Sequence, residues 1–348
     1  MFPDMQLWLK VFLAVCAAFA VAFGSTPIVK QFAQRLGAMD NPGEARRIHT
    51  HPIPRMGGLA IFLGFLISVA LFADITKPVQ GILIGAVIIV AVGAVDDILS
   101  LKYWIKLIVQ VAAAVIAVCH GVTIEGLMNP NIFSANQTVF IGILSIPVTV
   151  LWIVGVTNAV NLIDGLDGLA CGVSTISSVT MLVVALLVAE PNVAVILACL
   201  MGACIGFIPY NLNPAKIFMG DVGSQFLGYV LACVSIMGLF KFHAIITLIV
   251  PFLALAIPLF DTIFAFFRRI LHGQNPFRAD RQHIHHKLLA SGLSQKQAVA
   301  TLYGASAVLG IIAVMIAGPG TVGRIVCVVT MFIISVAVWF FVFRKKKE

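Results

Sequence analysis

The chain has 348 residues, of which 61% are hydrophobic and only 10% are charged, and its formal net charge is +8. Soluble domains contain roughly 45–50% apolar and about 25% charged residues, so this composition excludes a water-soluble globular protein and a disordered chain. The seven cysteines are scattered through apolar stretches without a CxxC spacing. That distribution argues against both a disulfide framework and a thiolate metal site.

Apolar stretches long enough to cross a membrane recur along the chain. They show no sustained alternation of period two, so we expect helices rather than a transmembrane barrel. The sequence predicts an all-α integral membrane protein with about eleven transmembrane helices, forming a single polytopic domain over residues 1–348. The expected spans are 5–28, 57–73, 79–95, 105–121, 138–157, 169–189, 193–209, 223–239, 243–267, 299–317 and 321–343. We expect Pro251 and Pro258 to kink the ninth span.

The basic residues indicate how these spans are oriented. When alternate loops are assigned to the two sides, 18 of the 22 Lys and Arg residues fall on one side. Because basic loops tend to stay in the cytoplasm, we expect the N-terminus outside and the C-terminus inside. The positive charge is then a topology signal, and nucleic acid is not expected as a partner.

The loops on the two sides differ in chemistry. The expected cytoplasmic loops lie near 30–56, 96–104, 158–168, 210–222 and 268–298, and most of the polar motifs fall in them. On the outer side, the segment 120–137 lacks Lys and Arg and is expected to hold a short hairpin. Any catalytic site is therefore expected at the cytoplasmic face.

Two adjacent acidic residues, Asp96 and Asp97, end the third expected span. An aspartate is costly inside a membrane, and two carboxylates at a helix C-terminus oppose the helix dipole. A solvated helix end is one explanation. A metal ion, the nearby Lys102 and Lys106, or a proton to be accepted would also justify the arrangement.

The segment 158–168, NAVNLIDGLDG, is the strongest signal in the chain. Asn158, Asn161, Asp164 and Asp167 recur every three residues in apolar surroundings, and in a helix this spacing places them along one face. Such a polar stripe can hold a hard cation together with hydroxyl-rich ligands. The alternative is a capped, hydrogen-bonded turn between two spans.

The segment 211–224, NLNPAKIFMGDVGS, opens the eighth expected span. The helix N-terminus beside Asp221 suits phosphate oxygens, and the aspartate suits the Mg²⁺ that accompanies phosphate. Lys216 and Phe218 lie close by in the sequence, and Gly220 and Gly223 allow close approach. The alternative is that Asp221 only caps the helix.

A histidine cluster, His283, His285 and His286, lies in the longest inner loop beside Arg281 and other basic residues. We expect it to bind phosphate as an anion clamp rather than zinc, because neither an HExxH motif nor a cysteine accompanies it. A solvated basic loop is the remaining alternative.

Two other charged residues are open to more than one interpretation. Arg55, in the PIPRMGG segment before the second span, offers a cationic approach to a phosphate, but an arginine at a membrane face also binds anionic lipid. Asp261, near the inner end of the ninth span, is equally well explained as a polar contact between helices.

Taken in order, these segments resemble the polyprenyl-phosphate N-acetylhexosamine 1-phosphate transferases, the membrane glycosyltransferase family 4. The resemblance is carried by PIPRMGGLAIF (52–62), VDD (95–97), NAVNLIDGLDGLA (158–170), FMGDVGS (218–224) and DRQHIHHKLL (280–289). The His-Ile-His-His run and the PIPR segment are more similar to the branch that uses UDP-N-acetylglucosamine than to the muramoyl-pentapeptide branch.

The resemblance implies transfer of a sugar 1-phosphate, N-acetylglucosamine 1-phosphate being favoured, from a UDP-N-acetylhexosamine to undecaprenyl phosphate, with release of UMP. This would be a first membrane step in the synthesis of a cell-envelope polysaccharide such as lipopolysaccharide or teichoic acid. The resemblance also implies Mg²⁺ as the cofactor, with Mn²⁺ as an alternative. It implies a multi-pass protein of the bacterial inner membrane, with its active site facing the cytoplasm. The choice of sugar and polymer stays open, as does a homodimer.

The resemblance implies roles for single residues as well. Asn161 and Asp221 would bind the metal, and Asp96 would be the base for the lipid phosphate. Because much of a phosphate monoester is already a dianion at neutral pH, Asp96 could instead orient the acceptor. The other expected catalytic residues are Asp97, Asp164, His283, His285 and His286. The expected substrate-binding residues are Arg55, Lys102, Asn158, Asp167, Asn211, Phe218 and Arg281, with Phe218 stacking on uracil.

Two other classes of protein compete with this interpretation. A transporter or flippase for an anionic nucleotide or lipid would place polar groups at mid-membrane and often shows duplicated halves. Here the acidic motifs lie at the inner ends of the expected spans, and no internal repeat is visible. A membrane zinc enzyme built on the histidines is the third hypothesis.

Overall fold

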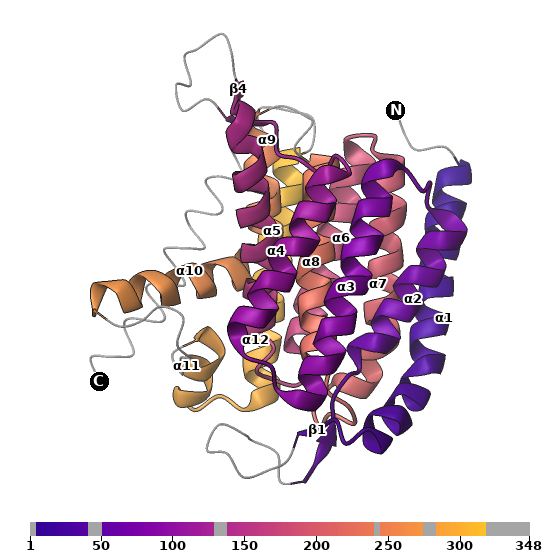
Figure 1. Ribbon diagram of the computed structural model, residues 1–348, viewed down its shortest axis with the longest axis vertical. Coiled ribbons are helices and arrows are strands. Elements are labelled where there is room, and N and C mark those ends of the chain that lie inside the picture. Colours follow the sequence, from indigo (N-terminus) through magenta and orange to yellow (C-terminus); the bar gives the residue numbers. More distant parts are fainter. Residues whose placement is uncertain (1–4, 41–50, 129–137, 240–243, 274–282, 318–348) are drawn as a thin grey trace.

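The computed structural model describes residues 5–40, 51–128, 138–239, 244–273 and 283–317, which form a bundle of helices with two small hairpin sheets (Figure 1). The helices are α1 (Met5–Arg35), α2 (Gly58–Phe72), α3 (Lys77–Leu99), α4 (Tyr103–Cys119), η1 (Gly142–Leu144, a 3-10 turn), α5 (Ser145–Leu162), α6 (Leu169–Leu187), α7 (Pro191–Asn211), α8 (Gly220–Leu239), α9 (Ala244–Ala254), α10 (Ala256–Leu271), α11 (Ile284–Ala290) and α12 (Gln295–Ala317). The strands are β1 (Met39–Asp40), β2 (Ile53–Pro54), β3 (Gly126–Met128) and β4 (Thr138–Phe140).

The expectation of a helical membrane protein is confirmed for this part of the chain. Seven helical segments are long and apolar enough to cross a membrane, and α2 and α4 are shorter apolar helices. Large apolar side chains such as Trp8, Phe12 and Phe19 are exposed along α1. Contact between such a surface and water is unfavourable, whereas the apolar interior of a bilayer accommodates it. The expected eleventh span, 321–343, lies outside the described residues.

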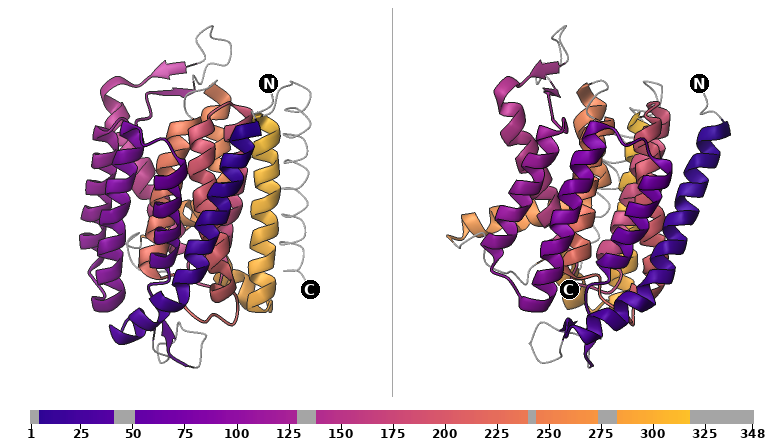
Figure 2. Two further views of the ribbon diagram at one scale, coloured as in Figure 1. Left: turned by 90° about the vertical axis from the view of Figure 1, so that its right-hand side faces the viewer. Right: turned by 45° about the vertical axis from the view of Figure 1, so that its right-hand side comes forward.

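The ninth expected span, 243–267, is not one continuous helix. It is divided into α9 and α10, and α10 runs across the direction of the other helices and leaves the bundle sideways (Figures 1 and 2). Pro258 cannot donate the helical hydrogen bond to the carbonyl of Ala254. That carbonyl instead accepts a hydrogen bond from the Ser177 hydroxyl of α6, at 2.5 Å. The two prolines therefore accompany a break rather than the kink that we expected.

A hairpin forms near the expected place, but its second strand, β4, takes up residues 138–140, which were expected to begin the fifth span. Strands β3 and β4 pair antiparallel with Leu127 opposite Val139, and they lie at the end of the bundle remote from β1 (Figure 1). At the other end, β1 and β2 pair antiparallel with Asp40 opposite Ile53. This second hairpin brings the PIPR segment to the end of the bundle at which α3 ends and α8 begins.

Helix α8 is the most enclosed helix of the bundle and is packed between α3 and α5, with α2 and α6 also against it. Its middle, residues 226–234, is buried almost without exception. Glycines let the surrounding helices approach closely: a Cβ on Gly58 would collide with the backbone of Gly223, and one on Gly228 would lie 2.7 Å from Cα of Thr157. This packing holds the first residues of α8 against α2, α3 and α5.

Candidate active site

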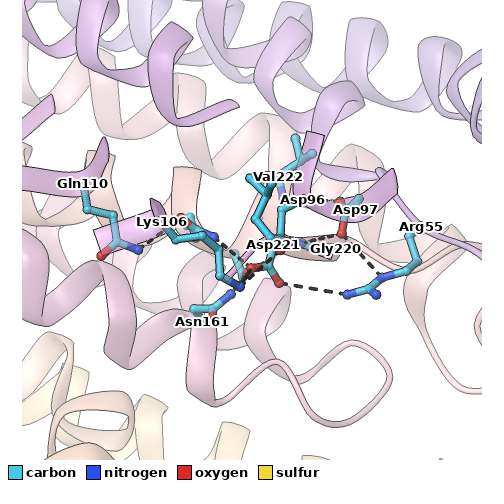
Figure 3. Close-up of polar contacts among 12 residues, drawn as sticks. Arg55, Asp96, Asp97, Lys106, Gln110, Asn161, Gly220, Asp221 and Val222 are labelled. Atoms are coloured by element: carbon cyan, nitrogen blue, oxygen red, sulfur yellow. Dashed lines mark hydrogen bonds and ion pairs between the residues drawn. The ribbon is translucent and has the colours of Figure 1, made fainter. Parts of the chain in front are cut away.

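The end of α3 and the start of α8 are joined through Asp97. Its buried carboxylate accepts hydrogen bonds from the backbone N–H groups of Asp221, at 3.1 Å, and of Val222, at 3.4 Å (Figure 3). These N–H groups have no partner within the helix, because the first turn of any helix leaves its donors unpaired. Gly220 is in the left-handed region, with φ +71°, and a Cβ there would collide with the Asp97 carboxylate. Asp97 is therefore an N-terminal cap supplied by a different helix.

Lys106 connects the other two acidic residues of this region. Its Nζ lies 2.8 Å from Oδ2 of Asp221 and 3.1 Å from Oδ2 of Asp96. The remaining oxygen of Asp96, Oδ1, accepts the backbone N–H of Leu101 at 2.7 Å. Both oxygens of Asp96 are thus engaged, in an arrangement that suits holding Lys106 in place as much as accepting a proton.

Arg55 reaches the same carboxylates from the other side. Its guanidinium lies 3.4 Å from Asp97, 4.0 Å from Asp221 and 3.9 Å from Asp40. Burial favours loss of the proton, but the surrounding carboxylates outweigh it and raise the pKa of Arg55. The arginine is therefore a permanent positive charge at the start of α8.

Main-chain hydrogen bonds hold Arg55 in this position. The N–H of Phe218 donates to the carbonyl of Pro54 at 2.8 Å, and the N–H of Gly57 donates to the carbonyl of Phe218 at 2.9 Å. The segments 52–58 and 218–223 therefore run against each other backbone to backbone. The Phe218 side chain is half-buried beside them, and its predicted stacking on uracil stays a prediction.

Asn161 and Asp221 lie together at this site, as a shared cation requires. The Nδ2 of Asn161 donates to the Ser224 hydroxyl at 2.8 Å, and Ser224 is one turn along α8 from Asp221 (Figure 3). Because Nδ2 is used in this way, Oδ1 is the Asn161 atom left to face a cation. Oδ2 of Asp221 is bound by Lys106 and by Gln225, whereas Oδ1 accepts no hydrogen bond from them and lies 4.0 Å from a guanidinium nitrogen of Arg55.

This pair of oxygens fits Mg²⁺, which usually binds through one or two carboxylates and completes its coordination with water and substrate phosphates. Among the residues that the structure describes, no three His, Cys, Asp or Glu side chains are grouped as a metal site. The arrangement therefore fits a cation shared with a substrate better than one enclosed by protein ligands alone.

Asp164 adds a further acidic group beside Asp221. Burial and the negative charge of Asp221 raise the pKa of Asp164 to about 7, although Arg55 acts in the opposite direction. Carboxylates that repel one another in this way favour the binding of a cation or a proton. The charge balance of the site is thus consistent with the expected cation.

Two of the residues expected to bind the nucleotide hold the loop before α8. Oδ2 of Asp167 accepts hydrogen bonds from Nδ2 of Asn213, at 2.9 Å, and from the backbone N–H of Ala215, at 3.1 Å. The buried Asn211 donates to the carbonyl of Ile217 at 3.1 Å. These contacts show how the loop is fixed, and the predicted roles of Asp167 and Asn211 in substrate binding stay predictions.

The histidine run lies against the loop 163–168. His283 Nδ1 is 2.9 Å from Oδ2 of Asp261, and the other oxygen of Asp261 accepts the backbone N–H of Ile284 at 2.8 Å. The His285 ring packs parallel to that of His283 and so close to Gly165 that a Cβ there would lie 2.5 Å from His285 Nε2. Asp261 of α10 is therefore a specific partner of this run.

The protonation of His285 limits what the histidine run can do. Burial, and the neighbouring His286, lower the pKa of His285 to about 4. His285 is therefore neutral at pH 7 and can offer a hydrogen bond but no charge. Its Nδ1 is buried without a hydrogen-bond partner. Arg281, expected to assist the cluster, lies outside the described residues.

The site contains polar residues that the sequence did not predict as site residues. Lys106 is one of them, and the structure places it between two carboxylates, whereas Lys102, which was predicted to bind substrate, is exposed at the start of α4. Gln110 and Gln225 were missed altogether. Both are buried, and they connect Asp221 to Asn158, which was expected to bind substrate. A glutamine inside an apolar stretch was the available signal.

These observations define a membrane-embedded helical protein in which acidic and basic side chains meet at a helix N-terminus suited to phosphate groups. The sequence profile of glycosyl transferase family 4 matches residues 79–239. The chain belongs to this family, as its similarity to full-length relatives shows.

Three relatives illustrate the similarity. The chain is 39% identical over 296 residues, 85% of its length and 82% of the relative, to a probable undecaprenyl-phosphate N-acetylglucosaminyl 1-phosphate transferase of Bacillus subtilis. It is 34% identical over 319 residues, 84% of its length and 78% of the relative, to a decaprenyl-phosphate N-acetylglucosaminephosphotransferase of Mycobacterium tuberculosis. It is 27% identical over 293 residues, 82% and 78% of the two chains, to an undecaprenyl-phosphate alpha-N-acetylglucosaminyl 1-phosphate transferase of Escherichia coli.

Proposed function

We propose that this protein transfers N-acetylglucosamine 1-phosphate from UDP-N-acetylglucosamine to undecaprenyl phosphate and releases UMP. The names of its relatives support the sugar phosphate and the polyprenyl acceptor. The observation that carries the proposal is the meeting of Asp96, Asp221, Lys106 and Arg55 at the first turn of α8. A membrane-embedded site of this kind suits a reaction between a lipid phosphate and a water-soluble nucleotide.

The chemistry needs little from the protein beyond position and charge. One diphosphate bond replaces another, so no external energy source is required, and phosphoryl transfer is catalysed mainly by positioning and electrostatic stabilisation. Arg55 and Lys106 supply positive charge where two anions have to meet. Since the acceptor phosphate is largely a dianion at neutral pH, Asp96 acts mainly by orienting Lys106 and the acceptor.

We further propose that Asp221 and Asn161 hold Mg²⁺, which, when bound, neutralises charge on the diphosphate and orients its oxygens. Asp97 holds the first turn of α8 in place, and Asp164 completes the acidic surroundings. The neutral His285 contributes hydrogen bonds to the donor rather than charge, and His283 and His286 lie beside it as further hydrogen-bonding groups.

The proposed orientation places this site at the cytoplasmic face of a bacterial inner membrane, with eleven spans, the N-terminus outside and the C-terminus inside. The distribution of Lys and Arg supports it. A green fluorescent protein fused to the C-terminus should fluoresce, and alkaline phosphatase fused after Glu190 should be active. The reverse pattern would contradict the orientation.

The activity is tested directly with the purified protein. With UDP-N-acetylglucosamine, undecaprenyl phosphate and Mg²⁺ it should release UMP, and EDTA should stop the reaction. A panel of other UDP-N-acetylhexosamines then establishes the choice of sugar. No UMP with any donor, or passage of intact donor into liposomes, would contradict the proposal and favour a transporter.

A further inference from the structure

A chain of three side-chain amides runs from Asp221 into the membrane-embedded part of the bundle. Gln225 Nε2 donates to Oδ2 of Asp221 at 2.8 Å, and Gln110 Nε2 donates to Oε1 of Gln225 at 3.1 Å. Asn158 Nδ2 donates in turn to Oε1 of Gln110 at 2.6 Å. The chain thus links α8, α4 and α5, and only its first member, Gln225, touches the proposed metal ligand.

The direction of this chain is determined at both ends. Asn158 Nδ2 also lies 2.8 Å from the carbonyl oxygen of Val154, which can only accept a hydrogen bond. At the other end Asp221, a carboxylate that also accepts from Lys106, can likewise only accept. Each amide therefore directs its N–H₂ group along the chain toward Asp221. Gln110 satisfies both Gln225 and Asn158 only when its N–H₂ faces Gln225 and its oxygen faces Asn158.

The free-energy cost of burying these side-chain amides within a membrane-embedded bundle indicates that they have a role. Gln110 and Gln225 are each 3% exposed, and they lie on helices whose residues are largely apolar. Polar side chains at such positions in membrane proteins are expensive and tend to be functional. Partners that hydrogen-bond to a metal ligand fix its orientation, and their loss typically weakens metal affinity about 10–100-fold.

We propose that Gln225, Gln110 and Asn158 form a positioning relay that holds Oδ2 of Asp221, so that Oδ1 is presented to the divalent cation. Asn158 is then a remote anchor of the relay and not a substrate contact. This inference rests on the proposed function, because it takes Asp221 as a ligand of that cation.

The test is a set of double-mutant cycles read out as Mn²⁺ affinity, measured by electron paramagnetic resonance on the purified full-length protein. Gln225→Leu should weaken Mn²⁺ binding about 10–100-fold. Gln110→Leu should weaken it less, and Asn158→Leu less again. In the Gln225→Leu background the other two substitutions should have no further effect, because the relay is already cut beside Asp221.

Two controls separate positioning from damage to the fold. Thr149→Val removes a buried polar group of α5 that is not part of the relay, the Thr149 hydroxyl, which donates to the carbonyl of Ser145 at 2.6 Å. This variant should leave the Mn²⁺ affinity unchanged. Apparent melting temperatures without metal show which variants are folded. Where a leucine variant does not fold, the matching methionine variant removes the same hydrogen bonds and takes its place.

The outcomes distinguish this inference from the proposed function. Losses that add in the double variants, or an Asn158→Leu variant that only raises the KM for the UDP-sugar, would overturn the relay while the wild-type protein still binds Mn²⁺ and releases UMP. A wild-type protein that binds no Mn²⁺, either alone or with UDP-N-acetylglucosamine present, would overturn the metal site and the relay with it.

Discussion

The Asp97 carboxylate binds the backbone N–H of Asp221, so that two acidic residues from separate motifs are joined through the main chain. Asp97 holds the helix and lies beside Arg55, whereas the side chain of Asp221 is the one that binds Lys106. This division of roles between neighbouring carboxylates makes them separable by mutation.

Replacing Asp97 should lower both stability and activity. Asp97→Ala removes the cap of α8, which is worth about 1–2 kcal/mol for a typical N-cap, and shifts Asp221 away from its partners. Asp97→Asn keeps an acceptor oxygen and should lose less. Thermal unfolding in detergent and UMP release measure the two effects. A fully active Asp97→Ala protein would contradict the capping role.

The raised pKa of Asp164 predicts how the stability of the metal-free protein depends on pH. Burial and Asp221 raise the pKa of Asp164 to about 7 in the folded protein. In the unfolded chain the pKa of an aspartate is about 3.9, so the Asp164 carboxyl binds a proton more tightly in the folded state. Stability should therefore fall as the pH rises from about 4 to 7 and then level off. In the Asp164→Asn protein, stability should depend less on pH between about 4 and 7 than it does in the wild type.

Melting temperatures in EDTA between pH 5 and 8 test this dependence. At pH 8 the Asp164→Asn protein should be more stable than the wild type, and Mg²⁺ should narrow the difference by stabilising the wild type. Parallel curves for the two proteins would show that Asp164 has no raised pKa.

Gly165 should be required for activity, because the His285 ring lies so close to it that there is no room for a Cβ. In Gly165→Ala the new Cβ would lie 2.5 Å from His285 Nε2, so the histidine run has to move. A displacement of about 1 Å at a catalytic group can cost about 10²-fold in rate. Gly155→Ala is the matched control on α5, since a Cβ there meets nothing within 4 Å. Equal activity of both variants would exclude a catalytic role for this contact.

Asp261 and His283 should contribute to the rate of UMP release as one hydrogen-bonded pair. Asp261→Ala removes the partner of His283 Nδ1 and the acceptor for the N–H of Ile284, so we expect it to slow UMP release as much as His283→Ala does. The double variant should be no slower than either single variant. Kinetics of the three proteins at saturating donor measure this, and additive losses would show that the residues act separately.

The helical, membrane-spanning character of the chain and the meeting of the acidic motifs could be predicted because each follows from simple patterns. Long apolar stretches require helices in a bilayer, and motifs at the inner ends of spans must lie at the same face. Asp221 and Asn161 therefore came together as predicted.

Other features depended on packing that no periodicity reveals. Whether Gln110 and Gln225 face one another depends on the rotation of α4 against α8. The pairing of Asp261 with His283 depends on α10 leaving the bundle after the break near Pro258. The sequence places the two glutamines and Asp261 in spans and His283 in a loop, but it contains no sign of their partners.

Lys106 should oppose cation binding while supporting catalysis. Its ammonium lies 2.8 Å from Asp221 and 3.1 Å from Asp96, so Lys106→Gln removes a positive charge beside the proposed metal ligand. We expect Mn²⁺ to bind roughly 10-fold more tightly, which corresponds to about 1.4 kcal/mol, because a like charge is removed from beside the cation. The kcat should fall, because the acceptor loses a cationic contact. Lys102→Gln, at the exposed start of α4, is the control for cation binding and should leave the Mn²⁺ affinity unchanged. Because relay variants should weaken Mn²⁺ binding and Lys106→Gln should strengthen it, weaker binding in Lys106→Gln would show that the ammonium orients Asp221 instead of competing for it.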